Sequence, residues 1–382
     1  QYNDIHLLEE HYDAMVAYID YLETTINEES GITSDGQLGD WLGPQNNMLG
    51  TPFLTTAYHI YDLWIMKNVA ELLGKNEDAD RYRRLLSKVK QAFVDRYLKG
   101  SRVPAAVAQP SEIRLRLERN DAIARGNLKA VDYGPIDSEV FNTDHFTPTQ
   151  TAYVLALHFD LLPEQLRPLA AAELVADIER RDVHLSTGFV GAPYLPHVLS
   201  NNGQLDTAYA LLFQKSWPSW LYSVTQGATT VWERWDGWTE ENGFQDPAMN
   251  SFNHYAYGSI GAWLYSVVAG IELDPARPGH KHSILRPQPG GGLTQATGKL
   301  ETPYGELVSQ WTLADDTFDW IVVVPPNTTA TVHLPAKEAS DITLNGQAVS
   351  GSAHEVEAGK HHFCARIRFS SLLEGWSDRC RN

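Results

Sequence analysis

The sequence is poor in cysteine and in basic residues, and it contains no long hydrophobic run. Only Cys364 and Cys380 occur in 382 residues, which excludes a framework of several disulfides. No stretch of about 18 apolar residues is present, so we expect no membrane-spanning helix. Lys and Arg number 30 against 48 Asp and Glu, which gives a net charge of −18. Nucleic acids and anionic membranes attract a basic surface, so neither is an expected partner.

Other absences narrow the class of protein further. Residues 1–6 lack both the basic and the apolar region of a signal peptide. No cluster of Cys and His has metal-ligand spacing, and no glycine-rich loop suited to phosphate occurs, so we expect neither a metal nor a cofactor. The sequence carries no indication of an oligomeric state. What it does have is a rich supply of aromatic residues, with 11 Trp and 17 Tyr, which is consistent with recognition of flat rings or carbohydrates.

Hydrophobic periodicity divides the chain into a helical part and a β part. Apolar residues recur at helical spacing over residues 4–26, 51–74, 77–98, 147–162, 163–181, 205–214 and 249–271. From residue 274 onward, prolines, glycines and short alternating runs replace that pattern, and Asn345-Gly346 is a strong hairpin signal. We therefore predict a helical domain over residues 1–273, a β-sandwich over 274–369 and an irregular tail over 370–382.

Residues 227–238 concentrate the chemistry of the chain. Trp232, Trp235 and Trp238 surround Glu233 and Arg234 within seven residues. Indole faces suit stacking on the C–H face of a sugar, and glycoside hydrolysis usually requires a pair of carboxyl groups. An alternative interpretation is that the tryptophans belong to the core and that Glu233 forms a structural ion pair with Arg234.

Several separated motifs extend this interpretation. They follow one another in a fixed order at residues 39–42, 187–195, 209–212, 218–222, 227–236 and 249–258, with further matches at 278–282 and 325–330. In this order the chain, from about residue 3 to residue 369, resembles the bacterial α-L-rhamnosidases of glycoside hydrolase family 78. The resemblance implies a mainly α fold, an (α/α)6 toroid followed by an all-β sandwich. It also implies a carbohydrate partner, because the family removes terminal α-L-rhamnose with inversion.

The resemblance assigns roles to individual residues. Glu233 matches the general base of the family, His254 a histidine lining the rhamnose site, and Trp41 an aromatic wall of that site. The same motif contains Arg234, Trp232 and Trp235. We include them among the expected substrate-binding residues only as neighbours of Glu233. Asp40, which precedes Trp41, is expected to cap a backbone segment rather than to catalyse.

The sequence departs from the family pattern in one respect. The family's general acid lies in an upstream motif of the type Asp-Cys-Pro-Gln-Arg-Asp-Glu-Arg, followed by Gly-Trp-Thr-Gly-Asp, and neither is found here. Inverting hydrolysis needs both an acid and a base. We therefore expect a toroid incomplete at its N-terminus, with the general acid upstream of this chain and no hydrolytic activity from the chain alone. A non-catalytic rhamnose-binding or structural remnant is the alternative, and a bacterial cytoplasm or periplasm is the expected location.

Overall fold

The computed structural model describes residues 2–34, 36, 38–44, 49–100, 136, 138–335 and 340–367. The chain forms two compact units, one of residues Ile5–Ser259 and one of Gln1–Asp4 with Ile260–Asn382. The chain thus passes from one unit to the other at Ile260, and the predicted boundaries at residues 273 and 369 stay predictions. The predicted tail over residues 370–382 lies outside the described residues.

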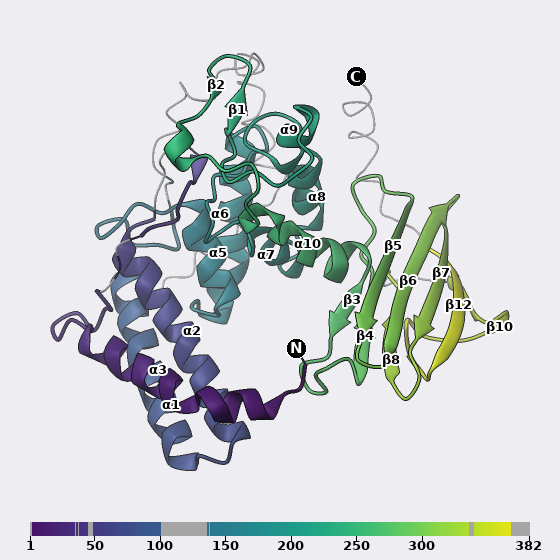
Figure 1. Ribbon diagram of the computed structural model, residues 1–382, viewed down its shortest axis with the longest axis horizontal. Coiled ribbons are helices and arrows are strands. Elements are labelled where there is room, and N and C mark those ends of the chain that lie inside the picture. The colour runs from purple at the N-terminus through teal and green to yellow at the C-terminus, as the bar shows by residue number, and fades with distance from the viewer. Residues whose placement is uncertain are drawn as a thin grey trace. The chain divides into compact units, whose positions relative to one another are not determined.

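The first unit is built from antiparallel helical hairpins (Figure 1). Each hairpin pairs two consecutive helices: α2 (Thr51–Leu72) with α3 (Asn76–Tyr97), α5 (Gln150–His158) with α6 (Arg167–Arg180), and α7 (Leu195–Asn201) with α8 (Leu205–Phe213). Helix α5 contacts both α2 and α7, so these three helices form one layer, and α1 (Ile5–Thr24) packs on α2. This confirms the predicted helical hairpins and the helical class of the first unit.

The burial of these helices follows from their sequences. Residues Gln150 to Leu157 of α5 are all buried, because a helix in the middle of the layer is covered on every side. Helix α3 is amphipathic instead, and its buried residues are spaced at helical intervals along one face: Ala79, Tyr82, Val89, Phe93 and Tyr97. Hydrophobic burial on these faces holds the hairpins together.

The single helix predicted over residues 249–271 is wrong. The segment is divided into the short turns η5 (Pro247–Met249) and η6 (Ala256–Ser259), helix α10 (Ile260–Trp263), the π-turn η7 (Leu264–Val268) and strand β3 (Ile271–Leu273). Two backbone hydrogen bonds explain the interruption: the Glu233 amide donates to Ser251 and the His254 amide donates to Val231. Backbone groups that pair with residues 231–233 are not available for a helix.

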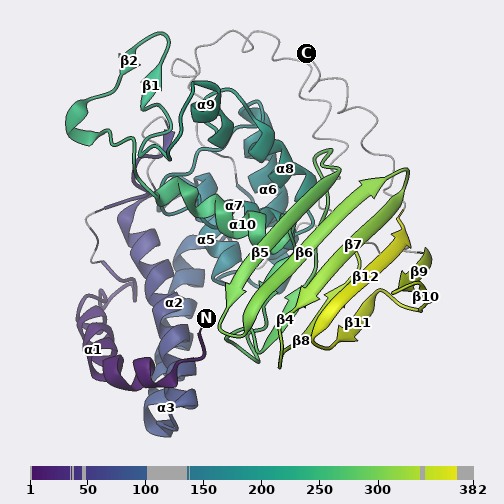
Figure 2. The ribbon, with the colours of Figure 1, turned by 45° about the vertical axis from the view of Figure 1, so that its right-hand side comes forward.

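The second unit contains two β-sheets, as predicted (Figure 2). The six-stranded sheet has the order β10 (Gln347–Ala348), β9 (Ser340–Leu344), β12 (Gly359–Arg366), β7 (Thr317–Val324), β6 (Gly305–Ala314) and β5 (Gln295–Thr302). The four-stranded sheet has the order β11 (Ala353–Val356), β8 (Thr329–His333), β4 (His282–Leu285) and β3. The buried Trp311 of β6 donates its indole N–H to Val268 at 2.8 Å, which ties the larger sheet to the turn before β3.

Two tight turns fix the strand register of the larger sheet. Asn345 and Gly346 both have positive φ and connect β9 to β10 through a two-residue loop. Asp315 and Asp316 adopt the same left-handed conformation between β6 and β7. A two-residue hairpin with two positive φ values matches the twist of the strands that it joins. The hairpin predicted at Asn345-Gly346 is confirmed.

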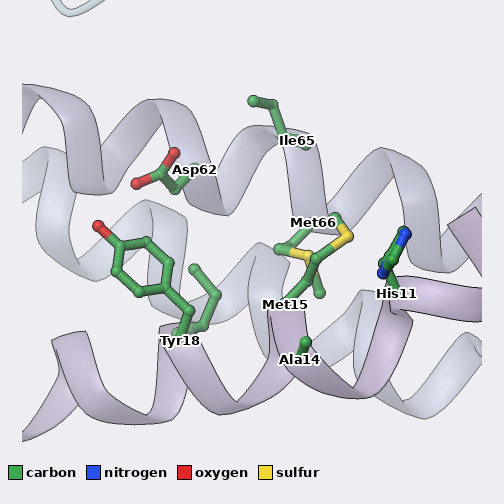
Figure 3. A pocket seen from close by; sticks show the side chains of 8 residues that line it. His11, Ala14, Met15, Tyr18, Asp62, Ile65 and Met66 are labelled. Carbon is green, nitrogen blue, oxygen red and sulfur yellow. The ribbon is translucent and has the colours of Figure 1, made fainter.

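Between α1 and α2 lies a pocket of about 400 Å³ that contains none of the predicted site residues (Figure 3). Most of its wall is apolar, but Asp62 of α2 also faces it, together with His11 and Tyr18 of α1. Burial raises the pKa of the Asp62 carboxyl to about 6, since the charged form loses hydration. Asp62 is thus a source of pH-dependent stability where α1 packs on α2.

Replacing Asp62 by Asn should stabilise the protein at pH 8 and have little effect at pH 4. The unfolded carboxyl ionises near pH 3.8 and the folded one near pH 6, so ionisation disfavours the folded state as the pH rises between these values. The pocket is open to water, so the gain should be about 1 kcal/mol rather than the full value of the shift. Urea unfolding at the two pH values measures it. The exposed Asp13, changed to Asn, is the control; an equal effect of both substitutions at both pH values would contradict the assignment.

Candidate functional site

The site is organised around Asp40, whose side chain is 1% exposed. One carboxylate oxygen accepts hydrogen bonds from the Thr151 hydroxyl and from the Gly188 amide, the latter at 2.7 Å. The other oxygen accepts from the amides of Val190 and Gly191 at 2.8 and 3.2 Å. Burial raises the pKa of Asp40, whereas its four hydrogen bonds act in the opposite direction. Asp40 therefore joins the loop that carries Trp41 to the turn after residue 187, which agrees with the expected structural role.

Two glycines allow this close approach. A Cβ on Gly188 would lie 2.3 Å from the Trp41 carbonyl oxygen and 2.7 Å from that of Asp40. A Cβ on Gly191 would lie 2.4 Å from the Thr151 hydroxyl. No side chain fits at such distances. The two glycines of the motif at residues 187–195 are thus explained by close packing rather than by chemistry: Gly188 lies against the backbone of residues 40–43, and Gly191 lies against the side chains of Thr151 and Thr187.

A second buried carboxylate, that of Asp177, stabilises the segment that leads into the same turn. Asp177 of α6 accepts hydrogen bonds from Arg181 at 2.9 Å and from the Gln150 amide at 3.0 Å. Gln150 in turn accepts from the Ser186 amide at 2.7 Å and donates to the His184 carbonyl at 3.2 Å. The segment that precedes Gly188 is therefore fixed by side chains of α5 and α6.

Trp235 links the tryptophan-rich segment to this turn. Its indole N–H donates to the Thr187 carbonyl at 3.0 Å, and its ring stacks on Tyr257 with centroids 3.8 Å apart. The Tyr257 hydroxyl donates to the Leu42 carbonyl at 3.0 Å, and Trp220 donates its indole N–H to the Tyr257 carbonyl. Segments more than 200 residues apart in sequence are thereby brought together.

The remaining residues of the segment are held by their own partners. Trp232 is 8% exposed and packs edge-on against Phe252. Arg234 forms its ion pair with Asp236, at 3.1 Å, and Gln245 donates to the other oxygen of that carboxylate at 2.9 Å. The alternative in which Glu233 pairs with Arg234 is therefore incorrect.

Glu233 is held in a reciprocal pair with Ser251. The Glu233 amide donates to the Ser251 carbonyl at 2.8 Å, and the Ser251 amide donates to Oε2 of Glu233 at 2.7 Å. Oε1 has no hydrogen-bond partner among the described residues. The carboxylate is thus fixed through one oxygen while the other can bind a water or a ligand.

His254 lies next to this pair. Its amide donates to Val231, and its Nδ1 accepts a hydrogen bond from the Ala256 amide at 3.3 Å. A neutral ring with Nδ1 as acceptor carries its proton on Nε2. Nε2 has no partner among the described side chains, so it is available as a donor to a ligand.

The structure brings the predicted residues together through a residue that sequence analysis did not single out. The Phe189 amide donates to the Trp41 carbonyl at 2.9 Å, and the Phe189 ring stacks on His254 with centroids 4.9 Å apart. The backbone of Trp41 is thereby linked to His254 through Phe189. Trp232 and Trp235 are buried and contact protein groups, so their participation in substrate binding stays a prediction. Phe189 and Tyr257 lie within matched motifs, but no local pattern in the sequence distinguishes their roles.

Metal ligation and membrane insertion receive no support from the part of the chain that the structure describes. No group of three His, Cys, Asp or Glu side chains there could hold a metal ion. None of the helices described has the length and apolar character needed to cross a bilayer.

This geometry agrees with the similarity to known proteins. Residues 1–268 match the family model of the bacterial α-L-rhamnosidase six-hairpin glycosidase domain, and residues 270–348 match that of the bacterial α-L-rhamnosidase C-terminal domain. The chain belongs to the bacterial α-L-rhamnosidase family. A helical glycosidase domain followed by a β-rich module, predicted from the sequence, is confirmed.

Two curated α-L-rhamnosidases illustrate the relationship. The one from Formosa agariphila is 35% identical over 350 residues, which is 90% of this chain and 33% of that protein. The one from Streptomyces avermitilis is 36% identical over 371 residues, which is 95% of this chain and 31% of that protein. The chain thus spans about a third of the length of the curated rhamnosidases that it matches.

Solved rhamnosidase structures have the same fold. The α-L-rhamnosidase of Streptomyces avermitilis complexed with L-rhamnose superposes with a TM-score of 0.77 at 35% identity, covering 95% of this chain and 31% of that one. The native α-L-rhamnosidase of Aspergillus terreus gives 0.74 at 31% identity, covering 96% of this chain and 37% of that one.

Replacing Gly188 by Ala should destabilise the chain by about 1–3 kcal/mol, the usual cost of forcing extra atoms into a packed region. The added Cβ must displace the Trp41 carbonyl, which loosens the contact between the two segments. Thermal melting measures the effect. Gly261→Ala is the control, because no atom lies within 4 Å of its Cβ position. A Gly188→Ala protein as stable as the control would show that the two segments are not in the contact described.

Proposed function

We propose that this chain carries the base side of an inverting α-L-rhamnosidase site. In this proposal Glu233 activates a water for attack on the anomeric carbon of a terminal α-L-rhamnoside. The observation that carries the proposal is the state of the Glu233 carboxylate. One oxygen is fixed by the Ser251 amide, and the other has no partner among the described residues.

The reciprocal pair between Glu233 and Ser251 suits a general base. A base must be held within hydrogen-bond reach of the water that it deprotonates, and it should keep this orientation from one turnover to the next. The hydrogen bond from the Ser251 amide fixes Oε2, and the paired backbone prevents rotation of the segment. Oε1 is then the atom that takes the proton of the water.

Binding of the sugar is assigned to the groups beside this carboxylate. His254 can donate from Nε2 to a hydroxyl of rhamnose, and Trp41 can offer an aromatic wall. The solved Streptomyces avermitilis relative, complexed with L-rhamnose, supports rhamnose as the sugar. The neighbouring residues Arg234, Trp232 and Trp235 are assigned the role of shaping the site.

Inverting hydrolysis also requires an acid that protonates the leaving oxygen. The carboxyl groups described near Glu233 are already engaged: Asp40 accepts four hydrogen bonds, and Asp236 is held by Arg234 and Gln245. An acid about 6.5–9.5 Å from the base would leave room for the water. We propose that the acid is supplied by a residue outside the described part of the chain.

Glu233→Gln should lower kcat for an aryl α-L-rhamnoside by about 10²–10⁴-fold in enzyme that contains the general acid, because the amide cannot accept the proton of the water. Glu241→Gln, an exposed neighbour, is the matched control and should retain activity. The first-formed product of the unsubstituted enzyme, followed by NMR, should be β-L-rhamnose.

Near-normal turnover by Glu233→Gln would remove Glu233 from the mechanism, and α-L-rhamnose as first product would remove inversion. The non-catalytic alternative would be favoured if a protein that contains this chain and the remaining length of its relatives bound L-rhamnose but did not hydrolyse the rhamnoside.

His254→Ala should lower kcat/KM by about 10-fold through loss of a hydrogen bond to the sugar, without moving the acidic limb of the pH profile. The exposed His145, changed to Ala, is the control. A shift of the acidic limb in His254→Ala would make His254 a titrating catalyst rather than a binding residue.

A further inference from the structure

A continuous series of ring contacts leads from the buried motif to the surface. Trp235 stacks on Tyr257, and Tyr257 meets Phe189 edge-on with centroids 5.2 Å apart. Phe189 stacks on His254, and His254 lies parallel to Tyr255, with centroids 5.6 Å apart and an interplanar angle of 7°. The inner members are buried, Phe189 and His254 are half-buried, and Tyr255 is 88% exposed. The series therefore ends in an aromatic ring that faces solvent directly beside His254.

Tyr255 is unusual among the described residues. Its exposure exceeds that of every other large hydrophobic side chain described, including Tyr2 at 78% and Phe244 at 72%. Its backbone is not loose, because the Tyr255 carbonyl accepts the Gly258 amide at 2.8 Å and the preceding His254 amide is paired with Val231. A fixed backbone that presents a flat, largely apolar ring to water is a feature of binding surfaces.

We propose that Tyr255 is the platform for the leaving group of the rhamnoside. This assignment rests on the proposed function, in which the terminal rhamnose lies beside Glu233 and His254. The leaving group is bonded to that sugar and must extend from the site toward solvent. The exposed ring adjoining His254 is the surface that it meets.

The chemistry of this platform selects a class of leaving group. A phenol ring stacks on another flat face, which an aryl ring offers on both sides and a pyranose offers through its C–H groups. Among the described residues no Lys or Arg side chain lies over the ring of Tyr255, so an anionic leaving group finds no cation there. A methyl group is too small to cover the ring. Leaving groups with a flat apolar face should therefore be favoured over short alkyl groups.

Calorimetric titration tests this with ligands that share the rhamnose and differ beyond it. The ligands are methyl α-L-rhamnoside, an aryl α-L-rhamnoside and a disaccharide of α-L-rhamnose on glucose, titrated into the Glu233→Gln protein so that none is consumed. Tyr255→Ala should weaken binding of the aryl rhamnoside, the disaccharide or both by about 3- to 10-fold, as expected for loss of one stacking contact. The same substitution should change the affinity for methyl α-L-rhamnoside by less than about 2-fold. Tyr255→Phe should restore the affinity, because it keeps the ring, and the ligand that responds identifies an aryl or a sugar leaving group.

Two matched controls make the result specific. Tyr2→Ala removes another highly exposed tyrosine and should affect none of the ligands. Phe244→Ala removes the exposed ring of the β1 (Trp238–Thr239) and β2 (Gly243–Phe244) hairpin, which packs edge-on against Phe252. A selective loss in Phe244→Ala but not in Tyr255→Ala would move the leaving group to the hairpin and overturn the assignment.

Equal losses for methyl and flat-faced rhamnosides in Tyr255→Ala would show that Tyr255 only supports the sugar site, and unchanged affinities would show that it contacts no ligand. Either result overturns the assignment while leaving the proposed function intact. Failure of Tyr255-intact protein to bind any of the rhamnosides would instead remove the proposed function and this assignment with it.

Discussion

The buried Asp40 carboxylate is the constraint on which the site depends. Its four hydrogen bonds connect residues separated by up to 151 positions, and they place Trp41 beside the turn that carries Phe189. A buried carboxylate is costly unless its lone pairs are satisfied, so the surrounding amides must stay in place for the fold to be stable. The requirement for glycine at position 188 follows, because the acidic side chain draws backbone against backbone, and Gly191 leaves room for the side chains of Thr151 and Thr187. Stability and the shape of the site are thus determined by the same contacts.

Around Glu233, too, the same contacts determine the local fold and the shape of the site. Residues 250–255 would continue a helix if hydrophobic periodicity alone decided, but their backbone groups pair with residues 231–233. The cost is an interrupted helix, and the result is a carboxylate fixed at one oxygen and open at the other. Preorganisation of this kind lets a base act without reorientation at each turnover. The wrong prediction of a helix over residues 249–271 therefore coincides with the site, where local preference gives way to function.

Local signals predicted much of the fold. Helical spacing indicated α3, a change to alternating residues indicated the β module, and Asn345-Gly346 indicated a hairpin that the structure contains. The ordered motifs indicated Glu233 and His254, whose segments pair through backbone hydrogen bonds. Contacts over long sequence distances could not be derived from periodicity. Nothing near residue 40 points to Gly188, and nothing in the sequence pairs Arg234 with Asp236 rather than with Glu233. Exposure is likewise a property of the folded chain, so Tyr255 looked like any other aromatic residue of its motif.

We propose that Glu233, His254 and Trp41 form one sugar-binding site, which a crystal structure of the protein with L-rhamnose would test. We expect a sugar between these three side chains, with Oε1 of Glu233 separated from the anomeric carbon by a single water and Nε2 of His254 donating to a hydroxyl. L-Rhamnose bound instead in the pocket between α1 and α2, or on the β module, with Oε1 of Glu233 directed away from it, would show that these three side chains do not form the sugar site.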